Sequence, residues 1–249
     1  MRVLSIDLDY CMSDECDYYE SDFDSDNPFA KWDVWSKETG RDDGEIPINP
    51  ARVLECLDIF KEALKYCDDV DFGYEHDAIL YRLQDETDIE IINYDHHSDV
   101  LNGGGFEGVT QEYEYKTLKI FDNVCEGNWV GWLDAKNKLR KYTWINDREE
   151  GYDSLEEFEG FRRELLGDRY ENLYCENFKI DDYKFDYIFV CLSPSYIPTS
   201  HWKYFKIFMN EYKFTKKKFP NIINRKFEID TRYKLLNKYF VECNLTCKN

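Results

Sequence analysis

The sequence predicts an α/β layer fold with a mainly parallel sheet. Three short apolar runs, at residues 2–8, 89–94 and 185–192, have the length of buried strands. Apolar residues at helical spacing lie between them, most clearly at residues 53–67. Buried strands that alternate with helices are typical of a parallel sheet covered on both faces. The 249 residues, 43% of them hydrophobic, are enough for a core of this kind.

The first strand, at residues 2–8, ends in acidic residues. Residues 11–47 are acidic, aromatic and turn-rich, which indicates a long loop or an insertion. Pro50 then begins a helix, because proline is tolerated in the first helical turn. The apolar spacing of residues 53–67 continues that helix.

The middle of the chain contains the second strand. A turn at residues 73–76 is expected to lead into a helix over residues 78–83, and residues 89–94 form the strand. Gly103-Gly104-Gly105 predicts a flexible turn and lacks the lysine and serine of a phosphate loop. Residues 112–121 alternate between polar and apolar side chains, which favours a strand.

The last part of the chain begins with a long polar segment. Residues 135–184 are rich in helix-forming residues and indicate a helical insertion or subdomain. Residues 185–192 form the third buried strand, and a helix is expected over residues 201–212.

Composition limits the classes of function. A net charge of -20 argues against nonspecific binding to nucleic acid, which needs lysine and arginine to neutralise phosphate. Such a chain attracts cationic ligands, although solubility explains the charge equally well. No apolar run reaches the roughly 18 residues of a membrane span, and carboxylates interrupt the N-terminal run too early for a signal peptide. Nine cysteines without framework spacing predict reduced thiols and a cytoplasmic location.

The most informative segment is Asp95-His96-His97-Ser98-Asp99, which follows the strand at 89–94. In extended backbone, alternate side chains share a face, so Asp95, His97 and Asp99 are expected to point the same way. Asp7 and Asp9 end the first strand in a similar manner. Ligands of parallel sheets bind at the carboxyl ends of the strands. The two clusters therefore predict one metal centre.

The residue types favour particular metals. Carboxylates with imidazoles suit Mn, Fe or Zn, and the excess of acids makes Mn²⁺ the first choice. Four carboxylates exceed the needs of one divalent ion, so two ions that share ligands are expected. His76, one of four histidines, lies in a turn where a structural role is the commoner outcome.

These motifs resemble a known group of enzymes. Asp95-x-His97-x-Asp99 and Ser5-x-Asp7-x-Asp9 are similar to elements of the arginase and deacetylase superfamily. Together with Glu75-His76, Gly127-Asn128-Trp129 and residues 192–198, they resemble the peptide arginases of ribosomal-peptide biosynthesis. Those enzymes convert arginine side chains of a precursor peptide to ornithine and release urea.

The resemblance implies a three-layer arginase-like fold with a mainly parallel sheet. The strand order would be permuted, because the Asp-x-Asp element here comes first. It also implies a single catalytic domain over residues 1–249, with an acidic insertion at about 11–47 and a helical insertion at about 135–184. The expected partner is an arginine-containing ribosomal precursor peptide, with no nucleic acid and no membrane.

The resemblance also implies two Mn²⁺ ions. His76, Asp95, Asp99 and Asp7 would hold the first, and Asp95, His97, Asp7 and Asp9 the second, with Asp95 and Asp7 bridging. Asp99 would carry the proton to the departing amine. The candidates for binding the guanidinium are Glu75, Glu126 and Asn128.

Three further residues are expected to lie outside the ligand set. His96 would point away from the metals, as a core or supporting residue. Trp129 would pack in the core or form a wall of the pocket. Val130 takes the place of the proton-relay histidine of ordinary arginases, and valine carries no proton.

Other functions remain open at this stage. A haloacid-dehalogenase-like phosphatase also begins with a strand ending in Asp-x-Asp, where Asp7 would be the nucleophile and Asp9 its partner. That alternative leaves the cluster at Asp95, His97 and Asp99 unexplained. A deacetylase or another amidohydrolase is compatible with the same scaffold, because a fold does not determine a substrate. A binding module without enzymatic activity is the third alternative.

Overall fold

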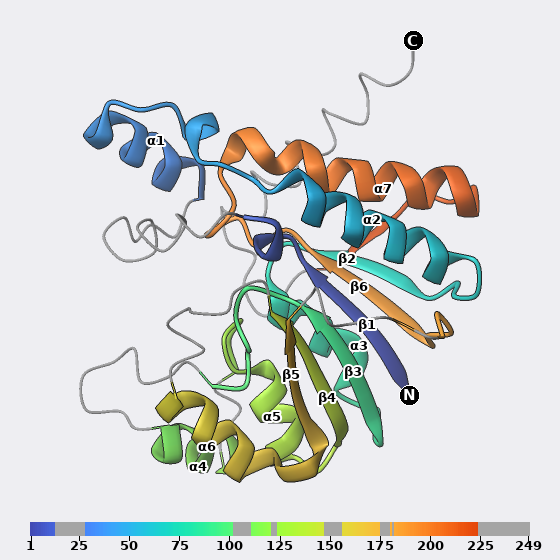
Figure 1. Ribbon diagram of the computed structural model, residues 1–249. Coiled ribbons are helices and arrows are strands. Elements are labelled where there is room, and N and C mark those ends of the chain that lie inside the picture. The colour runs from blue at the N-terminus through green and yellow to red at the C-terminus, as the bar shows by residue number, and fades with distance from the viewer. Residues whose placement is uncertain are drawn as a thin grey trace.

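A computed structural model describes residues 1–12, 28–101, 111–120, 124–146, 156–174, 180 and 182–223. Within these residues, seven strands form one sheet in the order β5-β4-β3-β1-β6-β2-β7, and every neighbouring pair is parallel. The strands are β1 (Arg2–Asp7), β2 (Val70–Gly73), β3 (Ile89–Tyr94), β4 (Leu139–Asn146), β5 (Tyr170–Tyr174), β6 (Tyr187–Cys191) and β7 (Asn221–Ile223). Helices cover both faces of the sheet (Figure 1), so the predicted three-layer α/β architecture is confirmed.

One face of the sheet, here the first face, is covered by α1 (Pro28–Thr39), α2 (Pro50–Leu64) and α7 (Trp202–Lys216). The helix expected after Pro50 is present, and the Asn49 side chain caps it by accepting from two backbone N–H groups. Phe60 of α2 packs against Phe72 of β2 and Phe208 of α7. These contacts join the two helices to the sheet in one apolar core.

The second face carries α3 (Leu80–Leu83), α4 (Gln111–Ile120), α5 (Trp129–Ala135) and α6 (Glu156–Leu166). Leu118 of α4 and Leu133 of α5 belong to the same buried cluster as Ile89 and Ile91 of β3. Short 3₁₀ turns connect the elements: η1 (Leu8–Cys11), η3 (Asp43–Glu45), η4 (His76–Ile79), η6 (Gly167–Arg169) and η8 (Thr199–His201).

The central strands are apolar on both sides. In β6, Ile188 and Val190 face the first core while Tyr187 and Phe189 face the second. Such continuous apolar runs are typical of strands buried between two helical layers. The three strands expected at residues 2–8, 89–94 and 185–192 are therefore confirmed as β1, β3 and β6.

The arrangement places a topological switch between β1 and β3. These strands are neighbours, yet the chain leaves β1 toward α2 on the first face and leaves β3 toward α4 and α5 on the second. Crevices at the carboxyl ends of such strand pairs are the usual binding sites of open α/β sheets.

Two predictions about secondary structure are wrong. Residues 112–121 were expected to form a strand, but Gln111–Ile120 is α4. Gln, Glu and Lys favour a helix there, and the alternation is too short to decide. Residues 135–184 were expected to be a helical insertion, but they contribute β4 and β5 to the sheet. The strand-favouring run Tyr142–Ile145 is hidden by the polar average of that segment.

A third prediction needs correction in part. Residues 11–47 were expected to be a loop or an insertion, yet Pro28–Thr39 is the helix α1. Its Trp32 and Trp35 are buried in the first core, so this part of the segment belongs to the body of the fold. Residues 13–27 and Gly103-Gly104-Gly105 lie outside the described residues.

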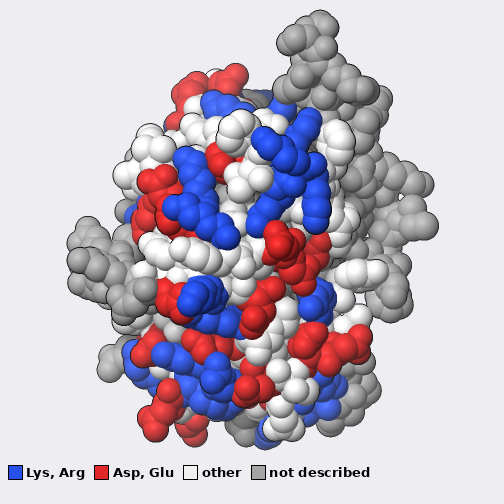
Figure 2. All heavy atoms as spheres, turned by 90° about the vertical axis from the view of Figure 1, so that its right-hand side faces the viewer, with Lys and Arg blue, Asp and Glu red and all other residues white. Residues whose placement is uncertain are grey.

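Charges of both signs are mixed on the face drawn in Figure 2. Two lysines, Lys213 and Lys216, lie in the last turn of α7, where cations stabilise a helix. Lys216 also pairs with Asp68 at 2.7 Å. No helix in the described part of the chain is both long and apolar enough to cross a membrane.

Candidate metal centre

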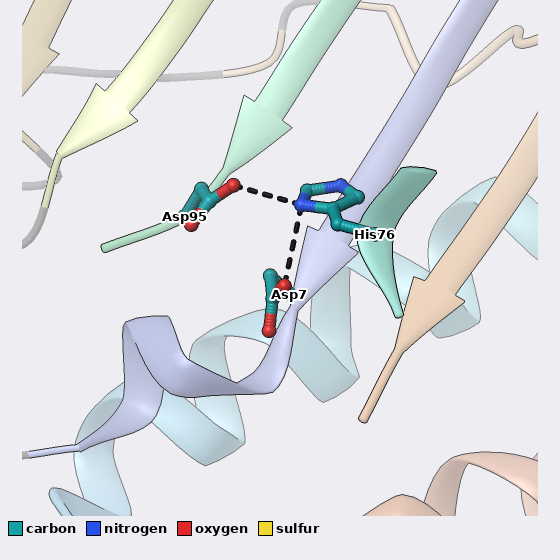
Figure 3. Close-up of side chains that lie close together, drawn as sticks. All are labelled: Asp7, His76 and Asp95. Atoms are coloured by element: carbon teal, nitrogen blue, oxygen red, sulfur yellow. Dashed lines mark ion pairs between the residues drawn. The ribbon is translucent and has the colours of Figure 1, made fainter. Parts of the chain in front are cut away.

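Three elements bring acidic and imidazole side chains together at the carboxyl edge of the sheet. Asp7 is the last residue of β1, His76 follows β2, and Asp95 follows β3. Their side chains point toward one another (Figure 3). All three residues are buried, with exposed fractions of 1–2%. The cluster therefore lies at the switch between β1 and β3.

The turn after β1 brings the second acid of the Asp-x-Asp pair back to the cluster. Asp7 caps η1, because its Oδ1 accepts the backbone N–H of Asp9 at 3.1 Å. Asp9 is buried, and its Oδ2 lies 3.0 Å from His97 Nδ1. Its Oδ1 accepts the backbone N–H of His96 at 3.3 Å. Asp9 thus joins the end of β1 to the loop after β3.

The loop after β3 differs from the extended chain that the sequence predicts. The strand ends at Tyr94, and residues 95–99 bend. Asp95 Oδ1 accepts the backbone N–H of His97 at 2.9 Å, and Asp99 has a left-handed φ of 52°. Asp95, His97 and Asp99 do converge, but through this bend and not through strand alternation.

His76 lies at the centre of the buried acids. Its Nδ1 is 2.8 Å from Asp99 Oδ2, 2.9 Å from Asp95 Oδ2 and 3.2 Å from Asp7 Oδ2. Its Nε2 lies 2.7 Å from Ser5 Oγ. The lone turn histidine is therefore part of the site, and the structural role favoured by its position alone is not its main one.

These distances fit a divalent cation. His76 Nδ1 is buried and has no well-directed hydrogen bond in the described part of the chain. A proton on Nδ1 would form a hydrogen bond with one carboxylate oxygen, whereas a divalent cation would contact all three. Ligands about 2.1 Å from an octahedral ion lie about 3.0 Å apart, and the three N···O distances scatter around that value. The residues present therefore fit a hard metal ion.

Two overlapping groups of ligands are present. Asp7, His76 and Asp95 form one group, here the inner group, and Asp9, Asp95 and His97 form the other, here the outer group. Within each, one ligand atom per residue lies within 4.8 Å of the others. Asp95 belongs to both groups, as expected for a bridging ligand. Asp99 joins the inner group through its contact with His76.

Burial and mutual repulsion raise the pKa values of three of the acids. Burial, with the charges of Asp7 and Asp95, raises the pKa of Asp9 to about 7. Burial and the charge of Asp99 raise the pKa of Asp95 to about 7. Burial also raises the pKa of Asp99. Carboxylates this close ionise together only when a cation neutralises them.

For His76, burial and the neighbouring charges shift the pKa in opposite directions. Burial alone would lower the pKa of His76, but the charges of Asp99 and Asp95 raise it well above its ordinary value. Burial would raise the pKa of Asp7, yet its contact with His76 lowers it. The inner group therefore already attracts positive charge to the position of His76 Nδ1.

Three polar residues that were not predicted as site residues orient the ligands, although Ser5 belongs to the Ser5-x-Asp7-x-Asp9 motif. Ser5 contacts His76, Asn93 Nδ2 donates to Asp95 Oδ2 at 2.9 Å, and the Ser193 hydroxyl donates to Asp7 Oδ2. Ser5 and Asn93 each precede their acid by two residues on a buried strand. A polar residue inside an apolar strand, on the face of the ligand, is the signal that identifies them.

Trp129 is both a core residue and a partner of the site. It is fully buried, and its indole N–H donates to Asp99 Oδ2 at 2.5 Å. Val130 is also buried, and its backbone N–H donates to Asp99 O at 3.0 Å. The start of α5 therefore touches the cluster directly.

His96 does not belong to either group of ligands. It is half-buried, and its ring lies edge-on to that of His97, with 4.7 Å between the ring centres. The expected exclusion of His96 from the ligand set agrees with this geometry, although it is not a core residue.

The candidates for binding a guanidinium are spread around the site. Glu75 is buried directly before His76, and Glu126 is half-buried before α5. Asn128 is buried, donates to Glu114 Oε1 at 3.0 Å and accepts the backbone N–H of Cys125 at 2.9 Å. These contacts give Asn128 a structural role, and the binding roles of the three residues stay predictions.

No family model, no curated protein and no solved structure matches this chain. The metal centre is thus defined by the geometry of its side chains.

Proposed function

We propose that this chain is a Mn²⁺-dependent peptide arginase of the arginase and deacetylase superfamily. It would hydrolyse the guanidinium of arginine side chains in a ribosomal precursor peptide, giving ornithine and urea. The observation that carries this proposal is the pair of overlapping ligand groups that share Asp95 at the ends of β1, β2 and β3. Their residues are among the six that the resemblance assigns to two ions, although Asp99 is in neither group and Asp7 is in the inner group only.

The six proposed ligands would form two overlapping sets, one for each ion. His76, Asp95, Asp99 and Asp7 would hold the first ion, and Asp95, His97, Asp7 and Asp9 the second. Two divalent ions sharing carboxylates supply a strong oxygen nucleophile from water at neutral pH. The six proposed ligands lie at one sheet edge, and hydrogen bonds with Ser5, Asn93 and Ser193 orient three of them.

Asp99 is the residue best placed to move the proton. Hydrolysis adds water to the guanidinium carbon, breaks the bond to the side-chain nitrogen and releases urea. Both protons of the water end on the departing nitrogen, which leaves as an ammonium group, and one of them would be carried by Asp99. The pKa of Asp99 is raised by burial, which favours a carboxyl group that takes up and returns that proton. Val130, in the place of a relay histidine, leaves this role to Asp99.

The substrate class follows from charge. A chain of net charge -20 attracts a cationic peptide over long range. Free arginine would also need partners for its own carboxylate and amine, and the sequence contains no motif for them. Glu75, Glu126 and Asn128 remain the proposed acceptors for the guanidinium.

The direct test is mass spectrometry of an arginine-containing peptide after incubation with the chain and Mn²⁺. We expect a loss of CH₂N₂ for each arginine converted, with urea in equal amount. Free arginine in a parallel reaction separates peptide from amino-acid substrates. Absence of both urea and the mass loss, in a chain shown to bind Mn²⁺, would reject the arginase proposal.

The alternatives give different results in the same preparation. One tightly held zinc with release of acetate from acetylated peptides would favour a deacetylase. Turnover of a phosphate ester with Mg²⁺, lost in Asp7→Asn, would favour the phosphatase. No bound metal and unchanged thermal stability after chelation would favour a binding module.

We also propose a cytoplasmic location. Among the described residues, the cysteines Cys11, Cys67 and Cys191 form no disulfide, which supports a reducing compartment.

A further inference from the structure

Asp99 is held in an unusual backbone conformation. Its φ of 52° lies in the left-handed region, which residues other than glycine adopt only when the surroundings hold them there. It is buried, and its Oδ2 lies 2.8 Å from His76 Nδ1. Something must therefore fix both the backbone and the carboxylate of this residue.

The first three residues of α5 supply that restraint. The Val130 N–H donates to Asp99 O at 3.0 Å, which fixes the backbone. The Trp129 indole N–H donates to Asp99 Oδ2 at 2.5 Å, which fixes the carboxylate. Gly131 lets the two segments meet, because a Cβ there would lie 2.0 Å from Val100 O. Backbone, side chain and close packing act on one short segment.

Trp129 is the residue that links this restraint to the metal ligands. Its ring centre lies 4.9 Å from that of His76, and its N–H reaches Asp99. An indole N–H only donates, so it constrains the orientation of the acceptor oxygen. A hydrogen bond to a charged carboxylate in a dry interior is among the stronger ones.

We propose that Trp129 is a positioning residue of the metal centre. It holds Asp99 Oδ2 toward His76 Nδ1, so that the inner group is assembled before a cation binds. The inference rests on the metal centre of the proposed function and is independent of the substrate. It predicts that Trp129 tunes metal affinity although it is not itself a ligand.

Trp129→Phe tests this, because phenylalanine keeps an aromatic ring and removes the N–H donor. Loss of a partner that orients a ligand typically weakens metal binding about 10–100-fold, and we expect that range for Mn²⁺ in isothermal titration calorimetry. Trp202→Phe is the matched control. Trp202 is fully buried in the first core and donates its indole N–H to Ile197 O at 2.9 Å. We expect its Mn²⁺ affinity to stay near that of the unmodified chain.

A spectroscopic readout follows from the same contact. Mn²⁺ bound beside Asp99 should change the emission of the Trp129 indole. The chain has six tryptophans, so the Mn²⁺-dependent change should be smaller in Trp129→Phe than in Trp202→Phe. A substitution that merely loosened the core would not produce this difference.

The outcomes are distinguishable. A folded Trp129→Phe that binds Mn²⁺ as tightly as Trp202→Phe overturns the inference. If Trp129→Phe does not fold by circular dichroism, the unmodified chain decides: calorimetric Mn²⁺ binding without any change in indole emission overturns it. If Mn²⁺ affinity depends on Trp129 but the chain releases no urea, the proposed function is rejected and this inference is supported.

Discussion

The inner and outer ligand groups share Asp95 but are built differently. In the inner group, Asp7 and His76 are each 2% exposed, and each contacts a serine hydroxyl. In the outer group, the His97 side chain is 25% exposed and its ring packs on Tyr196, with 4.9 Å between the ring centres. The inner group is thus enclosed by the sheet and α5, and the outer group faces the loops.

In the proposed binuclear site, this difference would separate two tasks. Enclosed ligands with fixed partners lose little freedom when a cation binds, so the inner position is preorganised. The outer position keeps a partly exposed ligand, which suits exchange with solvent and approach of a substrate. The following predictions examine this contrast, beginning with the residue that the groups share.

Asp95→Asn should have the largest effect. It removes the ligand common to both groups, so we expect loss of both proposed ions and of peptide hydrolysis. The loss should exceed the roughly 10–100-fold typical of a supporting partner. Metal content after desalting, measured by inductively coupled plasma mass spectrometry, and release of urea provide the readout.

Asp71→Asn is the control for that change. Asp71 is a buried carboxylate in β2 that accepts hydrogen bonds from Asn221 and Tyr187, at 2.6 and 3.2 Å. It should keep its metal. If Asp95→Asn also retained one ion at full occupancy, the two groups would be independent, contrary to the shared geometry.

His97→Ala should separate the groups. It removes an outer ligand only, so we expect loss of one of the two proposed ions, with the inner ion retained. The neighbouring His96→Ala is matched in chemistry and in position, and it should keep both ions. Metal content and Mn²⁺ titration measure this. The reverse order of effects would assign the ligand role to His96.

The pH dependence should reveal how the acids compete with protons. The pKa values of Asp9 and Asp95 are about 7 in the folded chain, against an ordinary value of 3.8. The folded state then binds more protons, so without metal these acids lower the stability as the pH rises from about 4 to about 7. The raised pKa of His76 acts in the same direction as the pH passes through it.

Metal binding should reverse this trend, because the ligands must release their protons. The pKa of Asp7 is lowered, so its own contribution changes only below about pH 3.8. We therefore expect the difference in Tm between Mn²⁺ and EDTA samples to be larger at about pH 8 than at about pH 5.5. A difference that is constant or shrinks over this range would contradict the assignment of these acids as ligands.

Much of the fold follows from short-range patterns. The strands β1, β3 and β6 are largely apolar segments of strand length, and α2 has a capping Asn49 before Pro50. The strands β4 and β5 were missed because both lie within a polar segment, where pairing with a buried neighbour decides the structure. Sequence periodicity carries no information about such pairing.

The meeting of Asp7, Asp9, Asp95 and His97 could be predicted because they directly follow buried strands, whose carboxyl ends share one edge of a parallel sheet. His76 needed the resemblance as well, since its contacts with Asp95 and Asp99 come from different strands. The role of Trp129 was not predictable, because only the approach of α5 to the bend at Asp99 brings them together. Tertiary packing sets that approach.

The smallest predicted effects concern two glycines. Gly131→Ala places a Cβ 2.0 Å from Val100 O, so α5 or the segment that contains Asp99 must shift. Such overpacking typically lowers the free energy of unfolding by about 1–3 kcal/mol. We also expect weaker Mn²⁺ binding, because the contact of α5 with Asp99 is disturbed.

Gly160→Ala in α6 is the matched control, since no atom lies within 4 Å of its added Cβ. Alanine should stabilise that helix by about 0.5–1 kcal/mol and leave Mn²⁺ affinity unchanged. Denaturant unfolding and Mn²⁺ titration of both variants test the comparison, and equal Mn²⁺ affinities would show that the inner group does not depend on α5.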